Sequence, residues 1–147
     1  MAERSNDKFF ISIGPHFFNS LHKENPNRVT SGNLTSVWKR EEALDRVGGD
    51  ESLLQELCQI FLSGYPRLLE KLREAVVLGD PVALQQAAHS LKGELGYLGA
   101  PEATDIARSM EDMGRERNLT SSSASLTALE QSLALLHLAI DNSEGVH

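Results

Sequence analysis

The sequence has 147 residues, enough for one domain with a hydrophobic core, and its 24% charged and 5% aromatic residues are typical of a helical, water-soluble protein. Its formal net charge of −7 argues against nucleic-acid binding, and its single cysteine, Cys58, excludes an internal disulfide and a cysteine-based metal site. No apolar run approaches the roughly 20 residues of a membrane span, so we expect a cytoplasmic protein with no membrane segment.

Residues 1–36 differ in composition from the rest of the chain. Asn, Ser, Pro and Gly recur in them, and no helical period continues past Gly14-Pro15. We interpret them as a flexible N-terminal tail or linker. Four of the five phenylalanines also lie here: Phe9, Phe10, Phe17 and Phe18. A segment that docks through these aromatic pairs is the alternative interpretation.

From residue 37 onward, apolar residues recur at spacings of three and four, which predicts helices. A short helix over 37–47 ends at Gly48-Gly49. A long helix begins after Asp50, a good N-cap residue, and ends before Gly79. Pro66 lies inside this helix and should bend or split it.

The second half of the chain continues the helical pattern. Asp80-Pro81 supplies an N-cap acid and a proline at the first helical position, and that helix ends at Gly99. Another helix starts at Pro101, and the last follows a polar loop over 118–123. No strand pattern is present. We therefore predict an all-α fold: an antiparallel four-helix bundle over 37–142, with a short extra N-terminal helix as a lid and a C-terminal tail over 143–147.

The helix after Asp80 carries a single histidine, His89. At about 100° per residue, its apolar residues share one face: they are Leu84, Ala87, Ala88, Leu91, Leu95 and Leu98. His89 lies roughly 160° from Leu91, on the opposite face, and should meet water or a partner. The alternative is an ordinary surface histidine.

Two glycines, Gly93 and Gly96, lie within roughly 40° of His89 on the same helix. Each should destabilise a helix by about 1 kcal/mol relative to alanine. A side chain four residues after the histidine would lean back onto its ring, so we interpret the glycines as keeping the ring accessible. Lys92 lies about 60° from His89, and we expect an exposed ammonium whose nearest anion is a ligand on the ring.

Several segments together resemble the histidine phosphotransfer (HPt) domain of bacterial two-component phosphorelays: GGDESLL at 48–54, FLSGYPRLLEKLREA at 61–75, GDPVALQQAAHSLKG at 79–93 and YLGA at 97–100. The resemblance runs from about residue 38 to residue 140. It implies that His89 is the phosphoacceptor, that Lys92 helps to hold the phosphoryl group, and that Gly93 keeps the site open.

The resemblance also implies roles on the next helix. Glu111 matches a polar residue that hydrogen-bonds to the histidine and orients it, and Arg115 matches a basic residue found in some members. We assign Arg115 and Gln85 to contact with the partner or the phosphate. Without the resemblance, Glu111 and Arg115 are typical of a solvated i, i+4 ion pair contributing about a few tenths of a kcal/mol.

Two residues depart from the family pattern. Glu94 stands where a small residue is usual, which puts the packing beside the site in doubt. Lys39 stands where an aspartate cap is common, which suggests a frayed first helix.

The residue types indicate a carrier. An imidazole is partly neutral and nucleophilic near pH 7, but the sequence has no GxxxxGK[ST] loop and no cage of acids for a metal. We expect a phosphoryl carrier at His89 with no cofactor and no ATP-binding kinase domain of its own, either a separate protein or a module cut from a hybrid histidine kinase. The resemblance implies receiver domains of response regulators, which bring an aspartate and Mg²⁺, and an upstream sensor or hybrid kinase as partners. We expect a monomer.

Two other classes of function remain open at this stage. The first is a regulatory module that binds receivers without carrying phosphate. The second is a metalloenzyme, since helical bundles hold metals through Glu-x-x-His pairs, but the sequence has this spacing only at Glu144 and His147.

Overall fold

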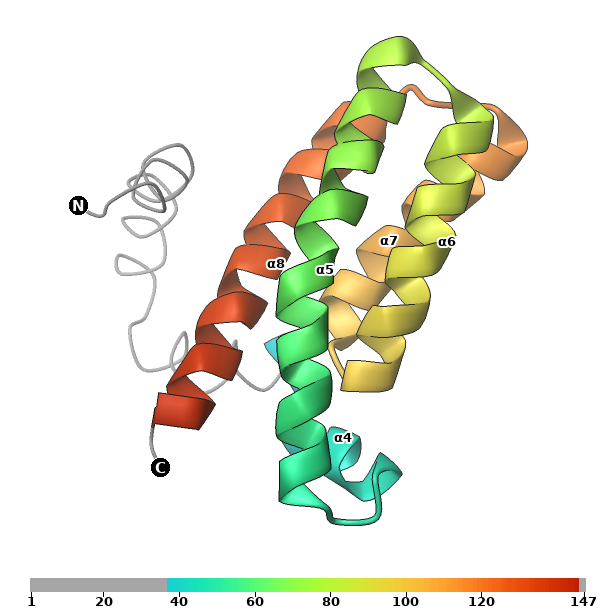
Figure 1. Cartoon of the computed structure of the whole chain (residues 1–147). Helices are drawn as coiled ribbons and strands as arrows, with labels where there is room; N and C mark the ends of the chain where they lie inside the picture. The colour runs from blue at the N-terminus through green and yellow to red at the C-terminus, as the bar shows by residue number, and fades with distance from the viewer. Residues whose placement is uncertain (1–36, 146–147) are drawn as a thin grey trace, which may run out of the picture. The chain divides into compact units, whose positions relative to one another are not determined.

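A computed structural model of the chain describes residues 37–145, with side chains up to Ser143 (Figure 1). The described helices are α4 (Arg40–Arg46), α5 (Glu51–Leu78), α6 (Pro81–Leu98), α7 (Pro101–Glu116) and α8 (Ser122–Gly145). No strand occurs between residues 37 and 145, so the predicted all-α class is confirmed. The interpretations of residues 1–36 and of the last two residues lie outside the described part of the chain.

Helices α5 to α8 form an antiparallel bundle with short connections, as the sequence predicts (Figure 1). The short helix α4 lies near the end of the bundle where α6 turns into α7 (Figure 1). Two hydrogen bonds tie its start to that turn. The indole of Trp38 donates to the carbonyl of Leu98 at 2.9 Å, and the amide of Lys39 donates to the carbonyl of Gly99 at 2.7 Å.

Local signals set the ends of the helices. The side chain of Asp50 accepts a hydrogen bond from the amide of Leu53, and that of Asp80 accepts one from the amide of Ala83. Helix α6 ends at Gly99, whose φ of 83° lies in the left-handed region that favours glycine. A Cβ at Gly99 would also lie 2.9 Å from the carbonyl oxygen of Lys39.

Three features differ from the sequence prediction: the interior of one helix and the ends of two others. Helix α5 is continuous through Pro66, so the predicted split does not occur. Pro66 is exposed, whereas the buried residues Tyr65 and Leu69 continue the core face of the helix around it, so packing outweighs the missing hydrogen bond. Helix α4 begins at Arg40, three residues late, because the two residues before it bond to the α6–α7 turn.

Helix α8 is the third difference, since it runs to Gly145 and residues 143–145 are helical rather than tail. The hydroxyl of Ser143 accepts a hydrogen bond from Arg40 at 3.0 Å, which joins this end of α8 to α4. Among residues 37–145, no helix has the combination of length and apolar character that a membrane span requires.

The core lies between the four long helices and positions α6. The six residues predicted to share the inner face of α6 are all at most 6% exposed. They pack with the largest buried side chains of the neighbouring helices: Leu72, Met110, Leu129, Leu133 and Leu136. Since one face of α6 is fully committed to the core, the opposite face is held toward solvent, and His89 lies on it.

Candidate functional site

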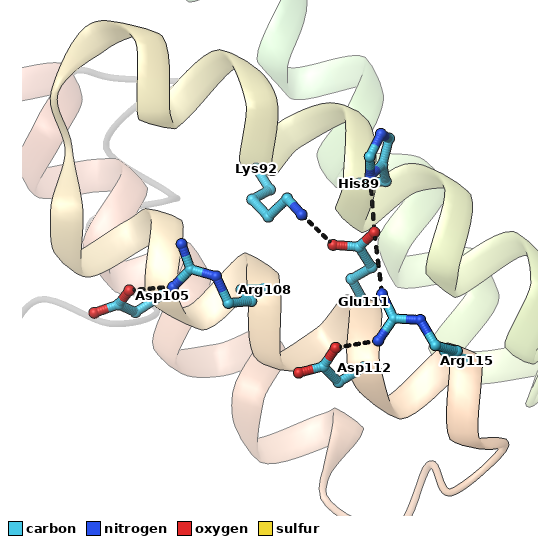
Figure 2. A network of polar contacts seen from close by, with 7 residues as sticks. All are labelled: His89, Lys92, Asp105, Arg108, Glu111, Asp112 and Arg115. Carbon is cyan, nitrogen blue, oxygen red and sulfur yellow. Dashed lines mark hydrogen bonds and ion pairs between the residues drawn. The ribbon is translucent and has the colours of Figure 1, made fainter.

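His89 stands on the outer face of α6, with a side chain that is 67% exposed. Its Nδ1 lies 2.8 Å from Oε2 of Glu111 on α7 (Figure 2). An ionised carboxylate only accepts hydrogen bonds, so Nδ1 carries the proton and donates it to this bond. In the neutral ring the lone pair is therefore on Nε2, and no hydrogen bond of Nε2 to another described residue is found.

Glu111 is the buried centre of the site, with a side chain only 6% exposed. Its Oε1 lies 2.7 Å from the ammonium of Lys92 on α6, and its Oε2 also faces the guanidinium of Arg115 at 3.5 Å (Figure 2). The hydrogen bond with Lys92 is the main cause that lowers the pKa of Glu111; the bond with His89 acts in the same direction, and burial opposes both. Glu111 is therefore ionised near neutral pH and places a negative charge directly behind the imidazole.

Lys92 differs from its sequence-based prediction. Its side chain is 28% exposed rather than free in solvent, and its nearest anion is Glu111 rather than a ligand on the ring. The lysine thus connects α6 to α7 through Glu111. The helical period placed Lys92 correctly on the His89 side of α6, but it could not show a carboxylate supplied by another helix.

The outer rim of α7 carries two solvent-exposed ion pairs. Arg108 pairs with Asp105 at 2.6 Å, and Arg115 pairs with Asp112, both at i, i+3 spacing (Figure 2). All four side chains are at least 46% exposed, so each pair contributes little to stability. Glu111 also lies 3.5 Å from Arg115, as in the i, i+4 pair that the sequence offered as the alternative, but it is buried rather than solvated and bonds across to α6.

Gly93 and Gly96 have no packing reason to be glycine. A Cβ built at either position meets nothing within 4 Å. This agrees with the interpretation that these positions are open beside His89. Gln85 lies one turn before His89, and no hydrogen bond from its side chain to the site is found among the described residues.

Gly114 on α7 is a residue that the sequence analysis missed. A Cβ there would lie 2.6 Å from the carbonyl oxygen of Pro81, 2.7 Å from the amide nitrogen of Gln85 and 2.8 Å from its Cβ. Helices α6 and α7 therefore approach closely at this point. The available signal was the run of small residues on the buried face of α7: Ala103, Ala107 and Gly114.

An apolar groove of about 420 Å³ lies between α5 and α6 and includes Gly93. Its other lining residues are Leu57, Ile60, Phe61, Glu94, Tyr97 and Leu98. Ile60 is 63% exposed and Tyr97 49%, which is unusual for such large apolar side chains. Glu94, the departure from the family pattern, lies on the edge of this groove, where partial burial raises the pKa of its carboxyl group. The sequence analysis did not identify this groove.

In the part of the chain that the structure describes, no cluster of three or more His, Cys, Asp or Glu residues could hold a metal ion. The Glu144 and His147 pair cannot be assessed, because His147 lies outside the described residues.

Comparisons with known proteins agree on one family. The family model described as the Hpt domain matches residues 56–139. The signal transduction histidine-protein kinase BarA of Escherichia coli K12 is 29% identical over 87 residues, which cover 59% of this chain and 9% of that kinase. BarA of Shigella flexneri is 28% identical over the same length. The chain thus spans less than a tenth of these relatives.

The fold also matches a solved structure. The crystal structure of histidine-containing phosphotransfer protein B (HptB) from Pseudomonas aeruginosa PAO1 has a TM-score of 0.52 and 24% sequence identity. The match covers 67% of this chain and 95% of HptB, and at this identity it supports the fold alone.

Proposed function

Because this chain belongs to the Hpt domain family, and so has a phosphotransfer role in two-component signalling, we propose that His89 is the residue that carries the phosphoryl group. One observation carries the proposal. Nδ1 of His89 is bonded to the buried carboxylate of Glu111, so the nucleophilic lone pair is on Nε2 of a largely exposed ring. Nε2 of the imidazole is thus presented to a partner, while Nδ1 stays bonded to Glu111.

The proposed step is a direct phosphoryl transfer. Nε2 of His89 attacks the phosphorus of an aspartyl phosphate on the partner, a new N–P bond forms, the P–O bond to the aspartate breaks, and the aspartate leaves as a carboxylate. The proton on Nδ1 stays in its bond to Glu111, and the positive charge that develops on the ring lies 2.8 Å from that carboxylate. The reverse step returns the phosphoryl group to an aspartate.

The cations around Glu111 have distinct proposed roles. Lys92 already neutralises part of the charge of Glu111, and its flexible ammonium also balances the charge of a phosphoryl group on the neighbouring ring. Arg115, which is exposed, contacts the phosphoryl group or the partner, and Gln85 serves the same surface. Gly93 and Gly96 leave room for the approaching phosphoryl group.

The partner completes the site in this proposal. The chain acts as a carrier rather than a kinase, and the receiver domain brings the aspartate together with its Mg²⁺. The receiver contacts the exposed apolar groove between α5 and α6, because Gly93 belongs both to this groove and to the open side of His89. An upstream sensor or hybrid kinase charges the relay.

Labelling of the protein by a receiver tests the function directly. The chain is incubated with a receiver domain carrying a radioactive aspartyl phosphate, and the labelled chain is treated with acid and with base. We expect the label to be lost in acid and retained in base, as for a phosphoramidate bond on imidazole. A chain that binds the phosphorylated receiver but takes up no label would instead be a receiver-binding module that carries no phosphate.

A further inference from the structure

Gly114 lies on α7, three residues after Glu111, and touches α6 one turn before His89. The backbone hydrogen bond of α6 from the amide of Gln85 to the carbonyl of Pro81 is formed by the same two atoms that a Cβ at Gly114 would strike, at 2.7 and 2.6 Å. Both atoms belong to the backbone, so they cannot rotate away as a flexible side chain would.

The two helices are antiparallel, so contacts advance in opposite directions along them. His89 lies one turn after Gln85 on α6, and Glu111 lies about one turn before Gly114 on α7. Glu111 is therefore opposite His89, just as Gly114 is opposite Gln85. The contact at Gly114 therefore lies next to the bond between His89 and Glu111, and the same distance between α6 and α7 governs both.

The reach of Glu111 depends on this separation. Its side chain spans from α7 to both His89 and Lys92, with a hydrogen bond of 2.8 Å to His89 and an ion pair of 2.7 Å to Lys92. A Cβ at position 114 would need about 1 Å more room to reach ordinary van der Waals contact. A displacement of that size would take the bond to Nδ1 beyond hydrogen-bond distance.

We propose that Gly114 is a positioning residue for phosphoryl transfer: it lets α7 approach α6 closely enough for Glu111 to hold the proton of His89 on Nδ1. The inference deepens the proposed function and rests on it. The atoms nearest to a Cβ at Gly114 belong to Pro81 and Gln85 rather than to His89, so in this proposal Gly114 acts through the position of Glu111.

The test compares three variants by a spectroscopic and a chemical readout. Nitrogen-15 NMR of the imidazole reports which ring nitrogen carries the proton in the absence of phosphate. Phosphoramidate, a small phosphoryl donor that releases ammonia, then measures the rate of phosphorylation of Nε2 without a partner protein. Gly114→Ala inserts the clashing methyl group, and Glu111→Asp withdraws the carboxylate by about 1.5 Å without changing the helix contact.

Gly64→Ala is the matched control. Gly64 lies in α5, and a Cβ there meets nothing within 4 Å. We expect Gly64→Ala to keep the wild-type tautomer and rate. For Gly114→Ala and Glu111→Asp we expect a gain of the Nε2–H tautomer, which dominates in a free histidine side chain, and a rate reduced by about tenfold.

The proposal is overturned if folded Gly114→Ala, or Glu111→Asp, keeps the wild-type tautomer and rate. Glu111→Asp leaves the packing at Gly114 intact and tests the dependence on the reach of Glu111 separately, so an unchanged tautomer and rate in this variant overturn the proposal even if Gly114→Ala does not fold by circular dichroism. Failure of the proposed function would look different: the wild-type protein would take up no phosphoryl group at His89, while its tautomer and that of each variant would still be measurable.

Discussion

The bundle presents two histidines with superficially similar surroundings, one on each side. His89 on α6 bonds through Nδ1 to Glu111, and His137 on α8 bonds through Nδ1 to the hydroxyl of Tyr65 at 2.9 Å. The other nitrogen of His137 faces Asp141 at 3.5 Å, whereas no such partner of Nε2 of His89 is found in the described range. His137 is 41% exposed, against 67% for His89.

The difference lies in what each pairing leaves available. Tyr65 is buried, and its ring packs edge-on against the imidazole with 5.8 Å between the two ring centres. His137 therefore has a partner at each nitrogen and an aromatic ring packed against it. Burial raises the pKa of the Tyr65 hydroxyl, which keeps it a neutral partner. His89 instead has an anion behind it and an open nitrogen in front. Exposure alone does not make a nucleophile; the partner of the second nitrogen decides which ring is available.

The largest expected effect separates the two histidines directly. His89→Gln should abolish labelling by a phosphorylated receiver, because the amide side chain supplies no nucleophilic nitrogen. His137→Gln should be labelled at the wild-type rate. The measurement is incorporation of radioactive phosphate into each folded variant. Wild-type labelling of His89→Gln would place the acceptor elsewhere and break the comparison.

A smaller effect is expected from the cations on the two sides. Lys92 pairs across α6 and α7 with Glu111, and Arg73 pairs across α5 and α8 with Glu130 at 2.8 Å. Lys92→Ala should slow single-turnover transfer from one receiver by about ten- to a hundredfold, if the lost charge contributes about 1.4–3 kcal/mol to the transition state. Arg73→Ala should leave the rate unchanged.

Both changes should also lower stability in urea unfolding. Lys92→Ala should cost about 1–3 kcal/mol, because it leaves an oxygen of the buried Glu111 without its partner. A freely solvated Lys92, as the sequence alone led us to expect, would contribute almost nothing to this stability. Lys92→Arg should restore the rate only in part, since the planar guanidinium of arginine differs in shape from the compact ammonium of lysine. Equal transfer by Lys92→Ala and Arg73→Ala would show that the partner supplies all the positive charge.

The smallest effect is a pH dependence of stability on the His89 side. The pKa of Glu111 in the folded protein lies below its unfolded value, mainly because of Lys92. Ionised Glu111 therefore contributes stability that is complete above the unfolded pKa of about 4.3 and is lost as the pH falls through the folded pKa. Glu111→Gln cannot lose this contribution, so its stability relative to wild type should rise as the pH is lowered from 6 to 3.

Urea unfolding of both proteins across this range gives the measurement. A second comparison isolates the cause, with Lys92→Met present in both proteins, since this change removes the main source of the lowered pKa. In this background, the difference in unfolding free energy caused by Glu111→Gln should depend less on pH. A relative stability that stays constant with pH in the wild-type background would contradict the assigned charge state of Glu111.

Much of this protein follows from its sequence because the responsible signals are local. Asp50, Asp80 and Gly99 act on their own helix ends, and the apolar spacing of α6 is enough to place its inner face and therefore to turn His89 outward. The openness beside the ring at Gly93 could also be inferred, since residues four apart on one helix are always neighbours.

Only the tertiary structure decided what surrounds the ring. Helical spacing alone did not separate Glu111 from the exposed acids Asp105 and Asp112, and only the family resemblance pointed to its bond with His89. The structure added that the same carboxylate also holds Lys92, which is therefore not free. The close contact at Gly114 and the groove at Gly93 were not foreseen from any pattern. The physical reason is that a helical period sets the direction of a side chain about its own axis, whereas its partner depends on the separation and register of two helices, which the packing of the whole core determines.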